Sequence, residues 1–154
     1  MRNILTLDYS EADTEKIWKT AKKRLPILKP AVYDTRFFIE LFYSKDEALQ
    51  KKIKGEKARK EKYVSAVVIH EVYKLSIARE GRETARLKVA VLKQDFKIVP
   101  VNDQIAEFSA ELRHKYKLSM GDSMVAATAS TLKAVCISDD PHFQQVKEIQ
   151  TTWI

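Results

Sequence analysis

Hydrophobic and polar positions follow two alternating patterns along most of this chain. Short apolar runs of the kind found in buried strands occupy residues 28–34, the start of 63–80, 96–101, 134–138 and 148–154. Between them, apolar residues recur every three to four positions, which predicts helices over 35–43, the rest of 63–80, 82–94, 103–116 and 121–133. Strands that alternate with helices over short connections predict an α/β fold, with a largely parallel sheet and helices on both faces.

The first thirty residues lie outside this alternation. The spacing of Ile17, Trp18, Ala21 and Leu25 predicts a helix over residues 10–25. We expect this helix to dock on the domain body or across a dimer, because burying a Trp and two aliphatic side chains contributes several kcal/mol at ~25 cal/mol per Å².

The length of the chain fits one domain. Its 154 residues, with a hydrophobic content of 45%, can bury a single core. We therefore expect an N-terminal helical extension over residues 1–30 and one folded domain over residues 31–154. Within the domain, residues 45–62 are charged and mostly basic, and we interpret them as an exposed helix loosened at Gly55. Three interpretations of this stretch are open: it binds an RNA backbone, it binds an acidic partner, or it is only a solvent-exposed face.

Charge and cysteine content narrow the function classes. The formal net charge of +7 favours a polyanionic partner, with nucleic acid the first candidate. The single cysteine, Cys136, excludes an intramolecular disulfide and a cysteine zinc site, and it is typical of a reducing environment. No apolar run approaches the ~20 residues that span a bilayer, and the N-terminus lacks a signal-peptide layout. We therefore expect a cytoplasmic protein that does not associate with a membrane.

Four acidic residues stand in apolar segments, where a solvent-facing carboxylate is not expected. Asp34 and Asp140 come at or just after the ends of predicted strands, and Glu71 and Asp122 lie on the apolar faces of predicted helices. In a parallel sheet flanked by helices, ligands bind at the carboxyl ends of the strands. Because an unpaired buried carboxylate is strongly unfavourable, several of them together imply a compensating cation.

Each of these acids has a simpler alternative, and the alternatives differ in strength. Asp34 and Asp122 could be helix N-caps, and Asp140, which precedes Pro141, could be a turn residue. Glu71 is not explained by a cap or a turn, because it shares a helix face with apolar neighbours and therefore points toward the packed side of the helix. Oxygen-only ligands select Mg²⁺ or Mn²⁺, and the sequence has no evident His or Cys set for structural zinc. A metal of this kind beside a phosphodiester activates water, which is nuclease chemistry.

Four sequence blocks, YDTRFF, VSAVVIHE, GDSMVAATA and ISDDPHF, occur in this order. Together they resemble the PIN-domain family of metal-dependent ribonucleases, and within it the VapC-like toxins of VapBC toxin–antitoxin pairs. The resemblance covers residues 31–154 and implies a three-layer α/β/α sandwich with a mainly parallel central sheet. It implies a Mg²⁺ (or Mn²⁺) site formed by Asp34, Glu71, Asp122 and Asp140, which Ser138 helps to orient. It also implies RNA cleavage that leaves 3′-hydroxyl and 5′-phosphate ends, an antitoxin partner and a homodimer.

The last block departs from the family pattern, which often reads Thr, any residue, Asp, Pro, Asp, Phe. This chain has Ser138 in place of the Thr and His142 in place of the second acid. Asp139 competes with Asp140 as the ligand, and we favour Asp140 because it holds the family position before Pro141. Whether the site holds one metal or two stays open.

Arg36, two residues beyond Asp34, either contacts a substrate phosphate or forms a salt bridge with a site acid. The aromatic-rich segment 35–43 further favours a homodimer, because it suggests more apolar surface than one core needs. The leading hypothesis is a metal-dependent endoribonuclease that acts as the toxin of a toxin–antitoxin system. The alternatives are an RNA-processing nuclease of the same type without an antitoxin, and a non-catalytic regulatory protein that binds metal through the same acids.

Overall fold

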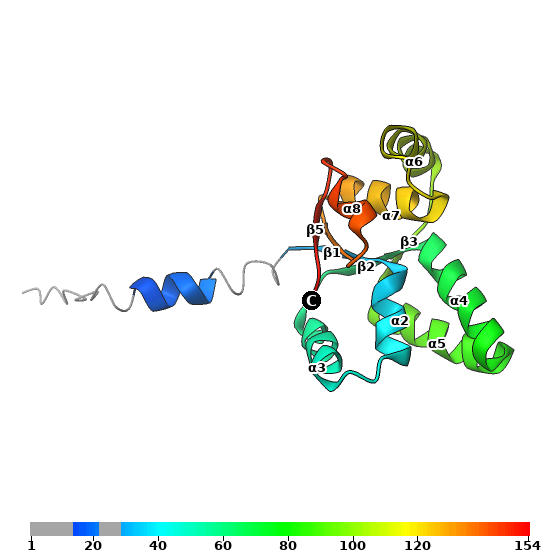
Figure 1. Ribbon diagram of the computed structural model, residues 1–154, viewed down its shortest axis with the longest axis horizontal. Coiled ribbons are helices and arrows are strands. Elements are labelled where there is room, and N and C mark those ends of the chain that lie inside the picture. The colour runs from blue at the N-terminus through cyan, green and yellow to red at the C-terminus, as the bar shows by residue number, and fades with distance from the viewer. Residues whose placement is uncertain (1–13, 22–28) are drawn as a thin grey trace, which may run out of the picture.

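A parallel five-stranded sheet forms the centre of the molecule (Figure 1), which we describe from a computed structural model of residues 14–21 and 29–154. The strands are β1 (Ala31–Tyr33), β2 (Lys62–Ser65), β3 (Lys97–Val99), β4 (Val135–Ile137) and β5 (Gln150–Thr152). Their order across the sheet is β3-β2-β1-β4-β5, and each neighbouring pair is parallel. The expected parallel sheet is confirmed.

Helices connect successive strands, and local sequence signals set several of their ends. They are α2 (Thr35–Tyr43), α3 (Glu47–Gly55), the short 3₁₀ turn η1 (Glu56–Ala58), α4 (Ala66–Glu80), α5 (Arg82–Asp95), α6 (Asp103–Tyr116), α7 (Met120–Thr131) and α8 (Pro141–Gln144). The Asn102 side chain caps α6 by accepting from the backbone N–H of Ile105. Gly81, at φ 86°, allows α4 to end and α5 to begin within one residue.

The strand order places the helices in two layers. The chain moves from β1 through β2 to β3 in one direction and then returns to β4 on the other side of β1. Because crossovers between parallel strands are right-handed, this reversal puts α2 to α5 on one face and α6 to α8 on the other, as Figure 1 shows. The three-layer α/β/α sandwich is therefore confirmed.

The reversal also makes the junction of β1 and β4 the switch point of the sheet. These neighbouring strands pair Ala31 with Val135 and Tyr33 with Ile137, so the residues that follow, Asp34 and Ser138, emerge at the same level. In open parallel sheets, ligands bind outside the carboxyl ends of the strands at such a switch point. The topology thus brings together two segments that lie about a hundred residues apart.

Aromatic packing fixes the start of α2 against the sheet. Phe37 and Phe38 are buried and form edge-to-face contacts with each other, and each also meets Phe96 edge-on. The expectation that segment 35–43 supplies surplus apolar surface is therefore wrong for Phe37 and Phe38, while Leu41 and Phe42 are partly buried against the core. Among the described residues, the exposed large hydrophobic side chains lie elsewhere, at Ile17, Trp18, Ile77, Leu87, Val91 and Met120.

The basic stretch 45–62 is not uniformly solvated. Arg59 is buried, and its guanidinium donates to Glu56 Oε2 at 2.9 Å and to the backbone oxygen of Lys29 at 2.7 Å. This arginine ties the segment before β2 to the residue that leads into β1. Arg59 thus has a structural role, and the RNA-tracking interpretation does not extend to it.

The N-terminal segment is helical over residues 14–21 and stands apart from the domain (Figure 1). Ile17 and Trp18 are 59% and 61% exposed, so docking on the body of the same domain, one of the two expected arrangements, is wrong for these two side chains. Docking across a dimer stays a prediction. Leu25 and the predicted start of the helix at Ser10 lie outside the described residues. None of the helices in the described ranges has the length and apolar character needed to cross a membrane.

Candidate metal centre

Asp34 is the buried acid at the end of β1. It occupies the N-cap position of α2, but its side chain does not cap the helix. The carboxylate turns instead toward β4, where Oδ2 accepts from the Ser138 hydroxyl at 2.9 Å. Asp34 is 4% exposed and Ser138 is buried with it. The simple helix-cap alternative for Asp34 is therefore wrong.

The pKa of Asp34 is raised by its burial and by the other site acids. Burial raises the pKa of Asp34 to about 6, and repulsion from Asp122 and Glu71 adds to the rise, while the hydrogen bond from Ser138 opposes it. The three carboxylates therefore lie close enough to interact through the protein interior. A cation among them would relieve this repulsion.

Glu71 lies on α4, between the beginnings of α2 and α7. Its Oε2 accepts a short hydrogen bond from the Thr35 hydroxyl, next in sequence to Asp34. On its other side, a Cβ added at Gly121 would overlap Glu71 Oε1. The glycine that precedes Asp122 therefore leaves the space that the Glu71 carboxylate occupies.

Asp122 stands in the first turn of α7, beside the end of β4. Ser119 caps this helix, because its hydroxyl accepts from the backbone N–H of Asp122. The cap alternative for Asp122 is wrong, and its side chain is available for another role. Three residues come together here, since one ligand atom from each of Asp122, Asp140 and His142 lies within 4.8 Å of the other two.

Asp140 is held in place by its own turn. Its Oδ1 accepts from the backbone N–H of His142 at 2.8 Å, and its own backbone N–H donates to the Ser138 hydroxyl at 3.1 Å. The turn alternative for Asp140 therefore holds, and it is compatible with a ligand role because it fixes the carboxylate beside Asp122. Ser138 contacts both Asp34 and Asp140, so one hydroxyl connects two of the four acids.

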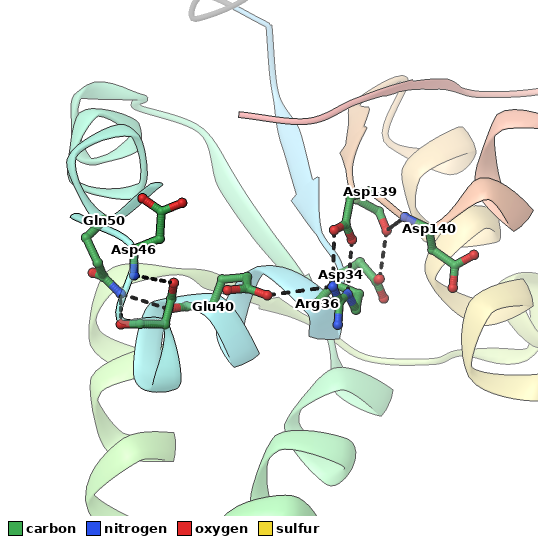
Figure 2. Close-up of polar contacts among 9 residues, drawn as sticks. Asp34, Arg36, Glu40, Asp46, Gln50, Asp139 and Asp140 are labelled. Atoms are coloured by element: carbon green, nitrogen blue, oxygen red, sulfur yellow. Dashed lines mark hydrogen bonds and ion pairs between the residues drawn. The ribbon is translucent and has the colours of Figure 1, made fainter. Parts of the chain in front are cut away.

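Asp139, the acid before Asp140, pairs with Arg36. The two side chains form a bidentate ion pair, with nitrogen to oxygen distances of 3.0 and 3.2 Å (Figure 2). Arg36 also reaches Glu40 at 3.6 Å. Arg36 thus forms a salt bridge, and contact between Arg36 and a substrate phosphate stays a prediction. This pairing occupies Asp139 and favours Asp140 as the acid that faces the site.

A buried hydroxyl at the same edge also lacks a partner. The parallel register of β1 and β2 places Ser65 level with Asp34, and within the described part of the chain Ser65 Oγ is buried with no hydrogen-bond partner. Together with the carboxylate oxygens, it forms a polar edge that suits a hydrated divalent cation. The donor set present therefore fits such an ion.

Sequence reasoning missed His142 as a member of this group. The signal was its position two residues after Asp140, across Pro141, where a short turn returns the side chain toward the acid it follows. The His142 Nδ1 lies 2.9 Å from Asp140 Oδ1.

Comparison with known proteins agrees with this architecture. A family model described as PIN domain matches residues 31–149. No curated protein matches the chain.

Several solved structures share the fold at low sequence identity. A toxin–antitoxin complex from Klebsiella pneumoniae is 24% identical, with a TM-score of 0.63, and the match covers 80% of this chain and 99% of that one. VapBC2 from Rickettsia felis, bound to a promoter DNA fragment, is 12% identical, with a TM-score of 0.69 and coverages of 80% and 98%. VapC20 from Mycobacterium tuberculosis, described as a Sarcin-Ricin loop cleaving toxin, is 19% identical, with a TM-score of 0.65 and coverages of 78% and 98%. At these identities the likeness concerns the fold alone.

Proposed function

Because this chain belongs to the PIN domain family, we propose that it is a metal-dependent endoribonuclease that hydrolyses RNA phosphodiester bonds. The observation that carries the proposal is the closeness of Asp122 and Asp140, whose ligand atoms lie within 4.8 Å of each other, with Ser138 connecting Asp140 to the buried Asp34. Burial raises the pKa of Asp34 to about 6, and the negative charges of Asp122 and Glu71 add to the rise.

The acids have distinct roles in this proposal. Asp34, Asp122 and Asp140 hold Mg²⁺ or Mn²⁺, and Glu71 completes or tunes the site. When bound, the ion supplies Lewis-acid chemistry that activates water and stabilises charge on the phosphate. Ser138 orients Asp34 through its hydrogen bond, and Thr35 orients Glu71.

The reaction is hydrolysis at phosphorus. Water attacks the phosphate, the bond from phosphorus to the 3′ oxygen breaks, and the proton lost by water balances the proton gained by the leaving oxygen. The products carry 3′-hydroxyl and 5′-phosphate ends. The net charge of +7 supports a polyanionic substrate, since it favours encounter with RNA. The cytoplasm, where RNA and a partner protein are both available, is the proposed location.

We further propose that the protein is a toxin with an antitoxin partner. Support comes from structures of similar fold that are toxin–antitoxin complexes. If the gene lies beside a small gene for a DNA-binding protein, and that protein relieves growth inhibition by this chain, the toxin is supported. An isolated gene whose product does not inhibit growth favours the RNA-processing alternative.

A homodimer is part of the same proposal. Ile77 near the end of α4, and Leu87 and Val91 on α5, are exposed apolar side chains on one helical pair. Burying them between two copies would be favourable. Sedimentation at several protein concentrations tests the assembly, and a monomer mass at every concentration would contradict it.

The central experiment is an RNA cleavage assay with purified protein. Cleavage is expected with Mn²⁺ or Mg²⁺, not with EDTA, and not with Asp122→Asn purified in parallel. Equal cleavage by the variant would contradict the assignment of Asp122 to the catalytic site. Metal binding without cleavage of any RNA tested would favour the non-catalytic regulatory alternative.

A further inference from the structure

His142 brings a nitrogen atom into a group of carboxylate oxygens. Its ligand atom lies within 4.8 Å of those of Asp122 and Asp140. His142 lies on α8. The residue after it, Phe143, is fully buried and anchors this short helix to the domain. The backbone that carries His142 is therefore fixed, although its side chain is 63% exposed.

The contact with Asp140 sets the orientation of the ring. Nδ1 of His142 lies 2.9 Å from Asp140 Oδ1. The ring is therefore held beside Asp122 and Asp140, the two carboxylates proposed as ligands. A neutral imidazole nitrogen this close to such carboxylates can join them as a metal ligand.

We propose that His142 is a nitrogen ligand of the metal centre and biases it toward Mn²⁺ and other divalent ions that accept nitrogen, at the expense of Mg²⁺. The inference rests on the proposed function in that both use the same centre. Beyond that function, it identifies His142 as the residue that determines which ion the centre prefers.

The reason is the chemistry of the donor set. Mg²⁺ is a hard ion that prefers oxygen ligands, whereas Mn²⁺ and the later first-row metals also accept imidazole. Asp122 and Asp140 alone give oxygen donors that serve both ions. Adding an imidazole improves the set for Mn²⁺ and not for Mg²⁺. Replacing His142 with an acid restores an oxygen set that favours both ions.

A spectroscopic test follows from the three histidines of the chain. In the variant His70→Gln/His114→Gln, His142 is the remaining histidine. Pulsed electron paramagnetic resonance of bound Mn²⁺ in this variant should show coupling to an imidazole nitrogen. The coupling should disappear when His142→Gln is added. Both removed histidines lie on exposed positions of α4 and α6, so the double variant is expected to fold.

Equilibrium binding gives a second measure. In His142→Asp, the ratio of Mn²⁺ affinity to Mg²⁺ affinity should fall by at least about tenfold, within the range of effects seen when metal-site partners change. The outcomes separate the two proposals. Mn²⁺ that binds and supports cleavage without nitrogen coupling, or with an unchanged affinity ratio in His142→Asp, overturns the role of His142 and leaves the nuclease standing. Absence of both binding and cleavage overturns both.

Discussion

The Ser138 hydroxyl donates to Asp34 Oδ2 at 2.9 Å, although the two residues are 104 positions apart in sequence. Both are buried at the switch between β1 and β4, so this hydrogen bond joins the two strands that meet at the candidate metal centre. It also offsets part of the cost of burying the Asp34 carboxylate.

Ser138→Ala should therefore weaken the centre. Without the hydroxyl, the pKa of Asp34 rises further, and both Asp34 and the Asp140 backbone N–H lose a partner. We expect metal affinity to fall by roughly ten- to a hundredfold, measured by titration calorimetry. Ser138→Thr keeps the hydroxyl and is the matched control. If the Ser138→Ala variant binds metal as tightly as the Ser138→Thr variant, Ser138 does not orient the site.

The raised pKa of Asp34 predicts a pH dependence of stability in metal-free buffer. The folded protein holds this proton up to a pKa of about 6, whereas the unfolded chain releases it near 3.8. The folded state thus binds more protons than the unfolded state between these values. The unfolding free energy of the wild type, relative to that of Asp34→Asn, is therefore highest below pH 4 and falls as pH rises through 6. The loss should reach roughly 3 kcal/mol.

Denaturant melts in EDTA, from pH 4 to pH 7.5, measure this difference. Asn keeps the shape of Asp34 and can still accept from Ser138, so the comparison isolates the charge. A constant stability difference across this range would show that the Asp34 pKa is not raised. Saturating Mg²⁺ or Mn²⁺ should stabilise the wild type more than the variant.

Removing single site acids should abolish most of the activity. We expect Asp34→Asn, Glu71→Gln or Asp122→Asn each to lower metal-dependent RNA cleavage by at least about a hundredfold, because each removes a charge that the reaction uses. Circular dichroism should show an unchanged fold. Full activity in any one of these variants would exclude that residue from the site.

The ion pair between Arg36 and Asp139 distinguishes the two neighbouring acids after β4. Since Asp139 is occupied by Arg36 (Figure 2), Asp139→Asn should retain far more cleavage activity and metal affinity than Asp140→Asn. Partly exposed pairs of this kind contribute about 0.2–1 kcal/mol to stability, so Asp139→Asn should unfold only slightly earlier. The reverse order of the two activities would make Asp139 the ligand.

Gly121→Ala should separate activity from stability. The added methyl group overlaps Glu71 Oε1, which sits at the end of a flexible side chain and can move, so the fold should survive. Ala in a helix gains up to about 1 kcal/mol over Gly. The displaced Glu71 loses its hydrogen bond from Thr35, and cleavage should fall severalfold or more while the melting temperature holds or rises.

Gly55→Ala is the matched control for this substitution. Gly55 ends α3 with helical φ, and a Cβ there meets open space. This variant should gain stability without loss of cleavage. Equal activity of the Gly55 and Gly121 variants would show that the position of Glu71 does not matter.

Truncation tests the N-terminal segment. A variant that begins at Lys29 keeps the backbone oxygen that Arg59 requires. Because Ile17 and Trp18 are exposed, removing them should leave the unfolding free energy of the domain within about 0.5 kcal/mol. If the segment docks across a dimer, sedimentation should show weaker self-association. A large loss of domain stability at low protein concentration would contradict the exposed placement.

The sequence by itself determined the elements and where the acids fall within them. Strand and helix periods are local properties, because each repeat reflects which side chains face a core over a few residues. For this reason the parallel sheet and the positions of Asp34 and Asp140 at or after strand ends could be predicted. The apolar helix faces that carry Glu71 and Asp122 follow from the same spacing.

Tertiary structure decided which side chains meet. The pairing of Arg36 with Asp139, the space beside Glu71 at Gly121 and the arrival of His142 beside Asp122 all join different elements. These contacts depend on the order of the strands and on packing between helices, and no local period encodes either one. The sequence therefore predicted acids that converge, and the folded chain selected which of them face one another and added a histidine to the group.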